Sequence, residues 1–233
     1  MYPEIAQRLL EEAEQQYDAI AEDFSATRAG LWPELERLRE LVPAGGSVLD
    51  VGCGNGRLYG LFAGTAVRYT GVDISSRMIG IAQTRWSDAG AKFVKASALN
   101  LPFPDQSFNA VVLAAALHHV PGSTLREQAL REAARVLLLG GILFVTVWNL
   151  FQRRYLWYVL ENNFLKLTGR NPLDWNDAQI PWKRGVWVSR YCHAFFPIEL
   201  SRLAEKAGLT VTEISYSEKN RRNIILIARK NQL

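Results

Sequence analysis

The sequence predicts an α/β fold built on a mostly parallel sheet, and three stretches carry this prediction. Residues 47–51 form a strand-like run that leads directly into a glycine-rich turn and renewed helical spacing. Residues 109–117 are almost continuously apolar, which is typical of a parallel strand buried on both faces. Residues 209–216 and 223–229 alternate as two strands, joined by the short polar turn 217–222. So short a connection joins antiparallel strands, and the last strand is therefore expected to be reversed.

Residues 1–42 are expected to form a helical N-terminal segment that caps the sheet. Apolar side chains recur with helical spacing over residues 3–22, opposite an acidic face. A further helix is expected to start near Pro33 and to continue through Leu41.

The turn after residues 47–51 predicts a nucleotide-binding loop. Gly52, Gly54 and Gly56 occupy alternate positions, and helical spacing resumes at Arg57. Glycine is needed where the backbone takes a positive φ or where a ligand approaches without a Cβ in the way. The turn also presents free N–H groups at the start of a helix. A nucleotide-like ligand is therefore expected at the carboxyl end of this strand.

The glycine spacing does not match the dinucleotide fingerprint G-x-G-x-x-G. Counted from Gly52, its third glycine would fall at Arg57, whereas Gly56 comes one residue earlier. Residues 69–73 predict the next strand, and Asp73 at its end is placed to accept hydrogen bonds from both hydroxyls of a ribose.

The remaining elements of the sheet follow from capping residues and apolar runs. Ser75 is expected to cap a helix through Trp86, and residues 91–95 predict the third strand. Pro197 is expected to open a late helix that Gly208 ends.

A helix and the fifth strand are expected between the apolar run and the later part of the chain. Thr124 is expected to cap this helix, which would continue to Leu138. Gly140 and Gly141 would then turn the chain into a strand over residues 142–148.

Residues 149–190 are expected to be an insertion that forms a lid on the ligand side of the sheet. Five of the seven tryptophans lie between Trp148 and Trp187, interleaved with Arg153, Arg154, Lys166, Arg170, Lys183 and Arg184. Aromatic planes beside cations suit stacking on unpaired bases next to phosphates. Two other interpretations stay open: the tryptophans fill a small core of the lid, or residues 153–167 form an interfacial helix on a membrane.

Composition indicates one globular domain over residues 1–233. Of these, 48% are hydrophobic, which allows a substantial core. Cys53 and Cys192 form no recognisable disulfide framework, so a reducing compartment is expected. The start does not resemble a secretion signal, and the longest uncharged run, residues 136–152, falls short of the ~20 apolar residues of a spanning helix. We therefore expect a soluble, cytoplasmic protein.

Charge is distributed unevenly along the chain. Residues 1–150 carry 13 Lys/Arg and 16 Asp/Glu, a net charge of −3, and residues 151–233 carry 14 and 7, a net charge of +7. A basic surface of this kind is expected for a nucleic acid or membrane partner, although a merely solvated basic face stays open.

The sequence resembles the class I methyltransferases that use S-adenosyl-L-methionine (SAM). Their pattern of hydrophobic residues, Asp and G-x-G-x-G is filled by residues 48–56, and their D-A-x-x-L-P-F-x-D-x-S-F segment is similar to residues 97–108. The resemblance implies a Rossmann-like, mostly parallel seven-stranded sheet with an antiparallel last strand and helices on both faces. It implies SAM as cofactor, S-adenosyl-L-homocysteine as product, and no metal. The cofactor-binding residues that it implies are Asp50, Gly52, Cys53, Gly54, Gly56, Asp73, Ile74, Ser97, Ala98, Leu99, Leu113 and His118.

Two residues depart from the pattern of these methyltransferases. Ser97 replaces the acid that in relatives commonly meets the adenine amino group, and Asn109 replaces the acid that opens the fourth strand. A serine hydroxyl accepts a hydrogen bond without charge assistance, so SAM binding is expected to weaken by ~1 kcal/mol.

The N-terminal segment closely resembles the methyltransferases that esterify carboxymethyluridine at the wobble position of tRNA. Their Y-x-x-I-A-x-x-F-S-x-T-R-x-x-x-W-P opening is present from Tyr17 to Pro33. Their R-Y-x-H-x-F segment is present from Arg190 to Phe195, after a counterpart of their V-P-W stretch at residues 180–182. The resemblance covers essentially the whole chain and implies tRNA as a partner, with a small activating subunit as in some members of the family.

This resemblance also implies the substrate site. Arg190 presents a planar fork that matches a carboxylate, His193 would donate a further hydrogen bond, and Tyr191 or Arg28 would shape the pocket. A phosphate contact or a surface ion pair remains the alternative for Arg190. A carboxylate is already ionised at neutral pH, so methyl transfer to it requires alignment rather than a general base.

We therefore predict a SAM-dependent methyltransferase that methyl-esterifies a carboxymethyl-type modified uridine in tRNA. One alternative is a methyltransferase for a small molecule, lipid or quinone at a membrane. Another is a non-catalytic SAM-fold subunit that binds RNA or acts as a scaffold, which the departures at Ser97 and Asn109 keep open.

Overall fold

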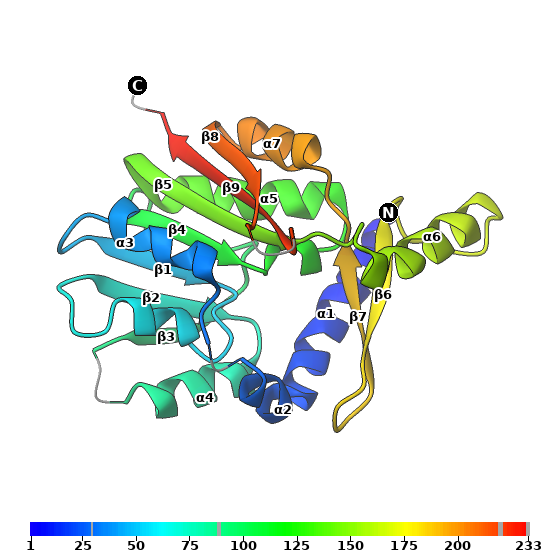
Figure 1. Ribbon diagram of the computed structural model, residues 1–233, viewed down its shortest axis with the longest axis horizontal. Coiled ribbons are helices and arrows are strands. Elements are labelled where there is room, and N and C mark those ends of the chain that lie inside the picture. Colours follow the sequence, from blue (N-terminus) through cyan, green and yellow to red (C-terminus); the bar gives the residue numbers. More distant parts are fainter. Residues whose placement is uncertain (29, 88–89, 219–220, 232–233) are drawn as a thin grey trace.

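A seven-stranded sheet forms the centre of the computed structural model, which describes residues 1–28, 30–87, 90–218 and 221–231 (Figure 1). β1 to β5 pair in parallel, and β9 is antiparallel to both β5 and β8. The predicted sheet with its reversed last strand is confirmed. In spatial order the strands are β3 (Lys92–Lys95), β2 (Arg68–Asp73), β1 (Ser47–Val51), β4 (Phe108–Ala114), β5 (Leu137–Trp148), β9 (Asn223–Lys230) and β8 (Leu209–Tyr216).

Helices cover both faces of this sheet, because its parallel strands are apolar on both sides. All five residues of β1 are buried. One face carries α5 (Ser123–Val136) and α7 (Pro197–Lys206), and the other carries α3 (Leu38–Leu41) and α4 (Ser76–Arg85). Each face thus has its own apolar core. As predicted, the Ser75 side chain caps α4 by accepting a hydrogen bond from the Met78 amide (3.1 Å).

Two helices at the N-terminus bring the predicted capping segment to the sheet. α1 (Pro3–Ala19) runs alongside β7 (Figure 1). The predicted continuous helix over residues 3–22 breaks at Ile20, whose φ of −104° and ψ of 7° are not helical, and α2 (Ala21–Ala26) follows. The next predicted helix consists of the 3₁₀ turn η1 (Pro33–Arg37) and α3.

Two expectations around the sheet are wrong. The helical spacing after Gly56 forms only the short 3₁₀ helix η2 (Arg57–Leu61), which turns and bends over residues 62–66 separate from β2. Thr124 does not cap α5, which follows Gly122 without a side-chain cap.

Gly140 and Gly141 lie within the bounds of β5 rather than in a turn before it, but the predicted strand over residues 142–148 matches the part of β5 that pairs continuously with β9. Gly140 takes a φ of +74°, and the pairing of β4 with β5 shifts register between Phe108 and Ala110. The extra residues of β5 are therefore accommodated as a bulge rather than as a turn.

The insertion consists of helix α6 (Arg153–Leu167) and the antiparallel hairpin of β6 (Asp177–Trp182) and β7 (Val188–His193). Figure 1 shows α6 and this hairpin on the side of the molecule away from β3. The helix over residues 153–167 is confirmed, whereas the hairpin was not predicted. Trp182 is buried, but Trp157, Trp175 and Trp187 are exposed, so the tryptophans do not simply fill a core. No helix in the described part of the chain has the length and apolar composition to cross a membrane.

Alanine substitutions in the glycine loop are expected to separate crowding from backbone strain. A Cβ at Gly52 (φ +77°) would meet the Cβ of Ala116 at 2.6 Å, whereas a Cβ at Gly54 (φ +54°) has no atom within 4 Å. Gly54→Ala should cost ~1 kcal/mol through its left-handed backbone alone. Gly52→Ala should cost clearly more and lower the melting temperature further in a calorimetric scan. Equal losses would contradict this packing.

Candidate functional site

A cavity opens at the carboxyl ends of β1, β2 and β4, beneath α1. The glycine loop, Asp73 at the end of β2, and the segment after β4 form its walls. Tyr17 of α1 and Trp148 at the end of β5 close it from the other side. The cavity therefore lies where an open α/β sheet binds its ligand.

The glycine loop is anchored to the neighbouring strand. The amides of Gly52 and Cys53 both donate to the carbonyl of Val72, at 2.8 and 3.0 Å. Because the loop is hydrogen-bonded to β2, the position of its backbone relative to the cavity is fixed. A larger residue at Gly52 would collide with Ala116.

Asp73 is held in place by two backbone amides. Its Oδ2 accepts a hydrogen bond from Gly54 (2.8 Å) and its Oδ1 accepts one from Ser75 (2.9 Å). Burial raises the pKa of Asp73, and these two amide bonds oppose the rise. Each carboxylate oxygen keeps a lone pair beyond these bonds, so the side chain suits a ligand with two adjacent hydroxyls.

Asp50 is a second carboxyl in the cavity wall. It is buried, and its Oδ2 accepts a 2.5 Å hydrogen bond from the Tyr69 hydroxyl. Burial raises the pKa of Asp50 to about 7, and its Oδ1 has no hydrogen-bond partner among the described residues. An unpaired buried oxygen is costly, so this position suits a ligand that brings a cationic or N–H donor.

The residues present thus fit SAM, which carries a ribose with two hydroxyls and an amino-acid ammonium group. Ten of the twelve residues implied for the cofactor line the cavity. The exceptions are Gly56 and His118. A Cβ at Gly56 would lie 2.7 Å from the Phe93 ring, so this glycine is required for packing. His118 is fully buried, and its neighbour His119 lines the cavity instead.

The two departures from the methyltransferase pattern lie in different places. Ser97 lines the cavity, where its hydroxyl accepts a hydrogen bond from the Leu99 amide (3.2 Å). Asn109 lies at the other end of β4, where its side-chain oxygen accepts a hydrogen bond from the Ser47 amide (2.9 Å). The change at Asn109 therefore supports the pairing of β4 with β1 rather than the ligand.

His119 and Tyr17 form a hydrogen-bonded pair that the sequence analysis did not identify as part of the site. His119 Nδ1 lies 2.8 Å from the Tyr191 carbonyl, and Nε2 lies 2.9 Å from the Tyr17 hydroxyl. Because a carbonyl only accepts, Nδ1 carries the proton and Nε2 accepts from Tyr17. Burial lowers the pKa of His119 to about 3, with the Arg190 charge acting in the same direction, so the ring is neutral.

Arg190 is a buried cation beside this pair. Its side chain lies between Trp148 and Trp182, with the guanidinium carbon 5.3 Å from each ring centre. The residue is 4% exposed, and Nε and Nη1 have no hydrogen-bond partner among the described residues. Tyr17 lies close enough to feel this charge: burial raises the pKa of its phenol to about 12, and Arg190 opposes the rise. A buried charge without a counter-ion predicts an anionic ligand.

Arg28 adds a second guanidinium at the mouth of the cavity. It lies over the Phe24 ring at 4.7 Å and lines the cavity wall. Burial lowers the pKa of Arg28, and the nearby Arg190 charge lowers it further. Neither arginine has an acidic partner within ion-pair distance in the part of the chain that the structure describes. Together they make this end of the cavity electropositive.

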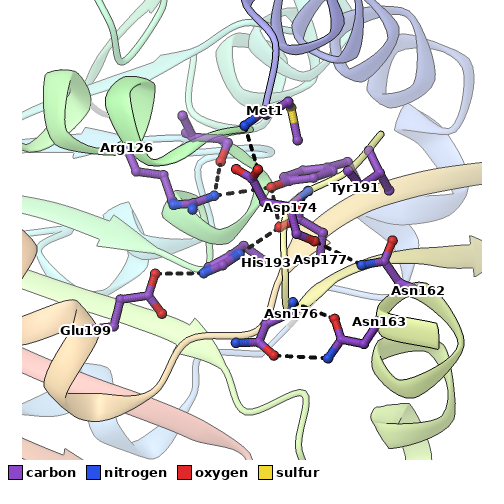
Figure 2. A network of polar contacts seen from close by, with 12 residues as sticks. Met1, Arg126, Asn162, Asn163, Asp174, Asn176, Asp177, Tyr191, His193 and Glu199 are labelled. Carbon is purple, nitrogen blue, oxygen red and sulfur yellow. Dashed lines mark hydrogen bonds and ion pairs between the residues drawn. The ribbon is translucent and has the colours of Figure 1, made fainter. Parts of the chain in front are cut away.

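Tyr191 and His193 lie on the opposite side of β7 from Arg190, in the polar network of Figure 2. Alternate residues of a strand point to opposite sides, so Arg190 and Cys192 lie on the side of β7 that faces Tyr17 and His119, while Tyr191 and His193 face away. Tyr17 and His119 line the cavity, whereas Arg190 lies behind them and is not itself a lining residue. Both nitrogens of His193 contact carboxylates, Nδ1 with Asp177 (2.7 Å) and Nε2 with Glu199 (2.8 Å).

The same network fastens the insertion to the two helices on one face of the sheet. The Tyr191 hydroxyl donates to Asp177 Oδ1 (2.8 Å) and accepts from Arg126 of α5 (3.2 Å). Glu199 belongs to α7, so His193 links β6, β7 and α7. In this position Tyr191 and His193 fix the hairpin. They influence the position of Arg190 only indirectly, through the hairpin.

His118, His119 and Cys192 are a candidate metal cluster, with ligand atoms within 4.8 Å of one another. His119 Nδ1 already donates to a carbonyl, and the Arg190 charge lowers the pKa of His118, after burial and the neighbouring His119. A cation would therefore have to displace a hydrogen bond and bind beside a guanidinium.

Comparison with known proteins matches residues 49–145 to the methyltransferase domain family. The chain is 29% identical over 247 residues to a tRNA (carboxymethyluridine(34)-5-O)-methyltransferase of Schizosaccharomyces pombe, covering 93% of this chain and 95% of that protein. It is 39% identical over 132 residues to the protein of the same name from Arabidopsis thaliana, covering 57% of this chain. The matched part spans only 31% of the length of the Arabidopsis protein.

Solved structures show the same fold. A SAM-dependent methyltransferase from Methanosarcina mazei matches with a TM-score of 0.72 at 23% identity, covering 87% of this chain and 99% of that one. A methyltransferase solved in complex with the Trm112 methyltransferase activator of Haloferax volcanii matches with a TM-score of 0.67 at 17% identity, covering 95% and 98%.

Substitution of His193 is expected to reveal how the insertion is fastened. Burial alone would lower the pKa of His193, but its hydrogen bonds to Asp177 and Glu199 raise it above the ordinary value. The raised pKa means that its stabilisation is present below pH ~6.5 and is lost as the pH rises through the folded-state pKa. His193→Gln should therefore destabilise the protein by ~2 kcal/mol at pH 6 and by less at higher pH.

Thermal unfolding between pH 5 and 9 measures this effect. Glu205→Gln, at an exposed position on α7, is the control. A loss that does not change with pH would show that His193 acts through packing alone.

Proposed function

We propose, from the premise that this chain is a SAM-dependent methyltransferase of the class I fold, that it methyl-esterifies a carboxymethyl-type modified uridine in tRNA. The observation that carries the proposal is Arg190, a buried guanidinium with two unpaired nitrogens beside the cofactor cavity. A carboxylate is the acceptor that such a cation binds best, because the two planar groups can pair through parallel hydrogen bonds.

Different residues would bind the cofactor and the acceptor. Asp73 and the glycine loop would hold the nucleoside of SAM, and Asp50 would face its amino-acid end. When bound, SAM supplies an electrophilic methyl group on its sulfonium. Arg190, with Arg28 nearby, would hold the acceptor carboxylate in line, and Trp148 and Tyr17 would exclude water.

Such a transfer needs no general base. The C–O bond to the carboxylate forms as the C–S bond breaks, and the carboxylate has no proton to lose at neutral pH. His119 is consistent with this chemistry: its pKa of about 3 keeps it neutral, and both its nitrogens are hydrogen-bonded. Its role would be to orient Tyr17.

The relatives and the charge distribution support RNA as the acceptor. Both the Schizosaccharomyces pombe and the Arabidopsis thaliana relative bear the name of a tRNA carboxymethyluridine methyltransferase. The net charge of +7 over residues 151–233 suits a polyanion. The structural neighbour solved with the Trm112 activator supports a small activating subunit as part of the proposal.

The chemistry of the product tests the proposal directly. The protein is incubated with bulk tRNA and SAM tritiated in the methyl group, alone and with a Trm112-type activator, and the RNA is then treated with mild alkali. Label released as methanol indicates an ester, whereas label retained on a base or a ribose contradicts the proposal. If the protein transfers no label and calorimetric titration detects no SAM binding, the scaffold alternative replaces the methyltransferase proposal.

Arg190→Met is expected to slow ester formation strongly while leaving the cofactor site intact. Loss of charge-assisted hydrogen bonds worth ~3 kcal/mol should lower the rate of methyl incorporation by ~100-fold, with SAM affinity changed less than ~2-fold. Methyl incorporation and SAM titration measure the two effects. Arg202→Met removes the same charge at an exposed position on α7 and should have neither effect. Retained turnover in Arg190→Met would remove this residue from the site.

A lipid-like acceptor at a membrane is the second candidate, and the surface of α6 favours it. Four large apolar side chains along this helix are 51–74% exposed, namely Trp157, Leu160, Phe164 and Leu167. Their spacing places them on one face of the helix. Flotation with anionic phospholipid vesicles, followed by methyl transfer to a lipid extract in preference to tRNA, would replace the tRNA proposal.

A further inference from the structure

A second cavity adjoins the cofactor cavity, with a volume of about 900 Å³. The two cavities share Arg28, Trp32 and Trp148 as common walls. The second is completed by η1, the start of α6, and the facing ends of β8 and β9. A ligand in the first cavity that is larger than a single nucleoside can therefore continue past Trp148 into this space.

The charges around the second cavity favour an anion. Arg37 is neutralised by a bidentate pair with Glu213 (2.8 and 2.7 Å), and Glu34 accepts a hydrogen bond from Asn223. Arg154 and Arg222 line the same cavity and have no ion-pair partner among the residues that the structure describes. Glu34 and Glu218 are the acids of the lining without an ion-pair partner among the described residues, since the neutral Asn223 amide leaves the charge of Glu34 in place. With the shared Arg28, three guanidinium groups without an ion-pair partner thus face two such carboxylates, which leaves an excess of one positive charge.

Aromatic rings lie among these cations. Tyr155 is stacked parallel to Trp148, with ring centres 6.0 Å apart and planes 10° apart, and both line the cavity. Tyr216 lines the far side. The guanidinium of Arg154 lies 5.2 Å from the Tyr155 ring centre. Rings that offer a stacking surface next to cations are the combination that binds an unpaired base together with its phosphate.

We propose that the second cavity binds the nucleotide adjacent to the methylated uridine, with its phosphate at Arg154 and Arg222 and its base at Tyr155. This inference rests on the proposed RNA substrate and adds to it a second nucleotide subsite. It makes recognition depend on RNA length, because a free nucleoside occupies only the first cavity.

Two substrates with the same carboxymethyluridine test the subsite: the free nucleoside and a trinucleotide with this residue in the centre. Arg154→Gln and Arg222→Gln should each lower kcat/KM for the trinucleotide by ~10-fold and leave kcat/KM for the nucleoside unchanged. Arg153→Gln is the matched control, since Arg153 is the exposed neighbour of Arg154 and does not line the cavity. Equal effects on both substrates, or an equal effect of Arg153→Gln, would overturn the subsite.

Binding separates failure of the subsite from failure of the proposed function. If neither substrate is methylated, fluorescence anisotropy with an unmodified five-nucleotide RNA still tests the cavity. Arg154→Gln and Arg222→Gln should weaken this binding by ~10-fold and lower its salt dependence, and Tyr155→Leu should weaken it without changing the salt dependence. The proposal would be overturned if none of the three variants changed RNA binding. It would also be overturned if an acidic peptide displaced the labelled RNA at a lower concentration than unlabelled RNA does.

Discussion

The unpaired charge of Arg190 is the interaction on which the functional half of this structure depends. Removing a guanidinium from water costs several kcal/mol, and a desolvated contact with an aromatic face returns about 2 kcal/mol. Trp148 and Trp182 therefore offset only part of this cost. Under the proposed function, the acceptor carboxylate would recover the remainder on binding. The neutral His119 brings no negative charge to balance Arg190, and Tyr17 offers Arg190 a hydrogen bond but no counter-charge.

Side chains of β7 alternate between the two sides of the β6–β7 hairpin, and the two sides have different roles. One side of β7 brings Arg190 toward the cofactor cavity, and the other side carries Tyr191 and His193 into a network with Asp177 and Glu199. The position of the cation therefore depends on groups that do not line the cavity. If Arg190 holds the acceptor as proposed, the hairpin must be held firmly, because small displacements of an aligned group reduce the rate of a displacement reaction steeply.

Ten of the twelve residues expected to bind the cofactor line one cavity, whereas of the four residues expected to bind the substrate only Arg28 lines it. Asp73 is the last residue of its strand, and the glycine loop follows the neighbouring strand, so local order along the chain places both at one edge of the sheet. The resemblance that pointed to Arg190 did not distinguish it from Tyr191 and His193. All four residues from Arg190 to His193 are buried, so no polar and apolar alternation marks which side faces the ligand.

By itself the sequence determined the strands, the reversed last strand, the glycine loop and the acid opposite it, because these follow from the periodicity of burial and from the order of strands and turns along the chain. The pairing of distant strands such as β1 with β4 followed from the family resemblance. The tertiary structure alone decided that His119 rather than His118 lines the cavity and that Tyr17 reaches it from α1. It also decided that a second cavity adjoins the first across Trp148. These features join segments more than 100 residues apart, and their geometry depends on how the N-terminal helices and the insertion pack over the sheet.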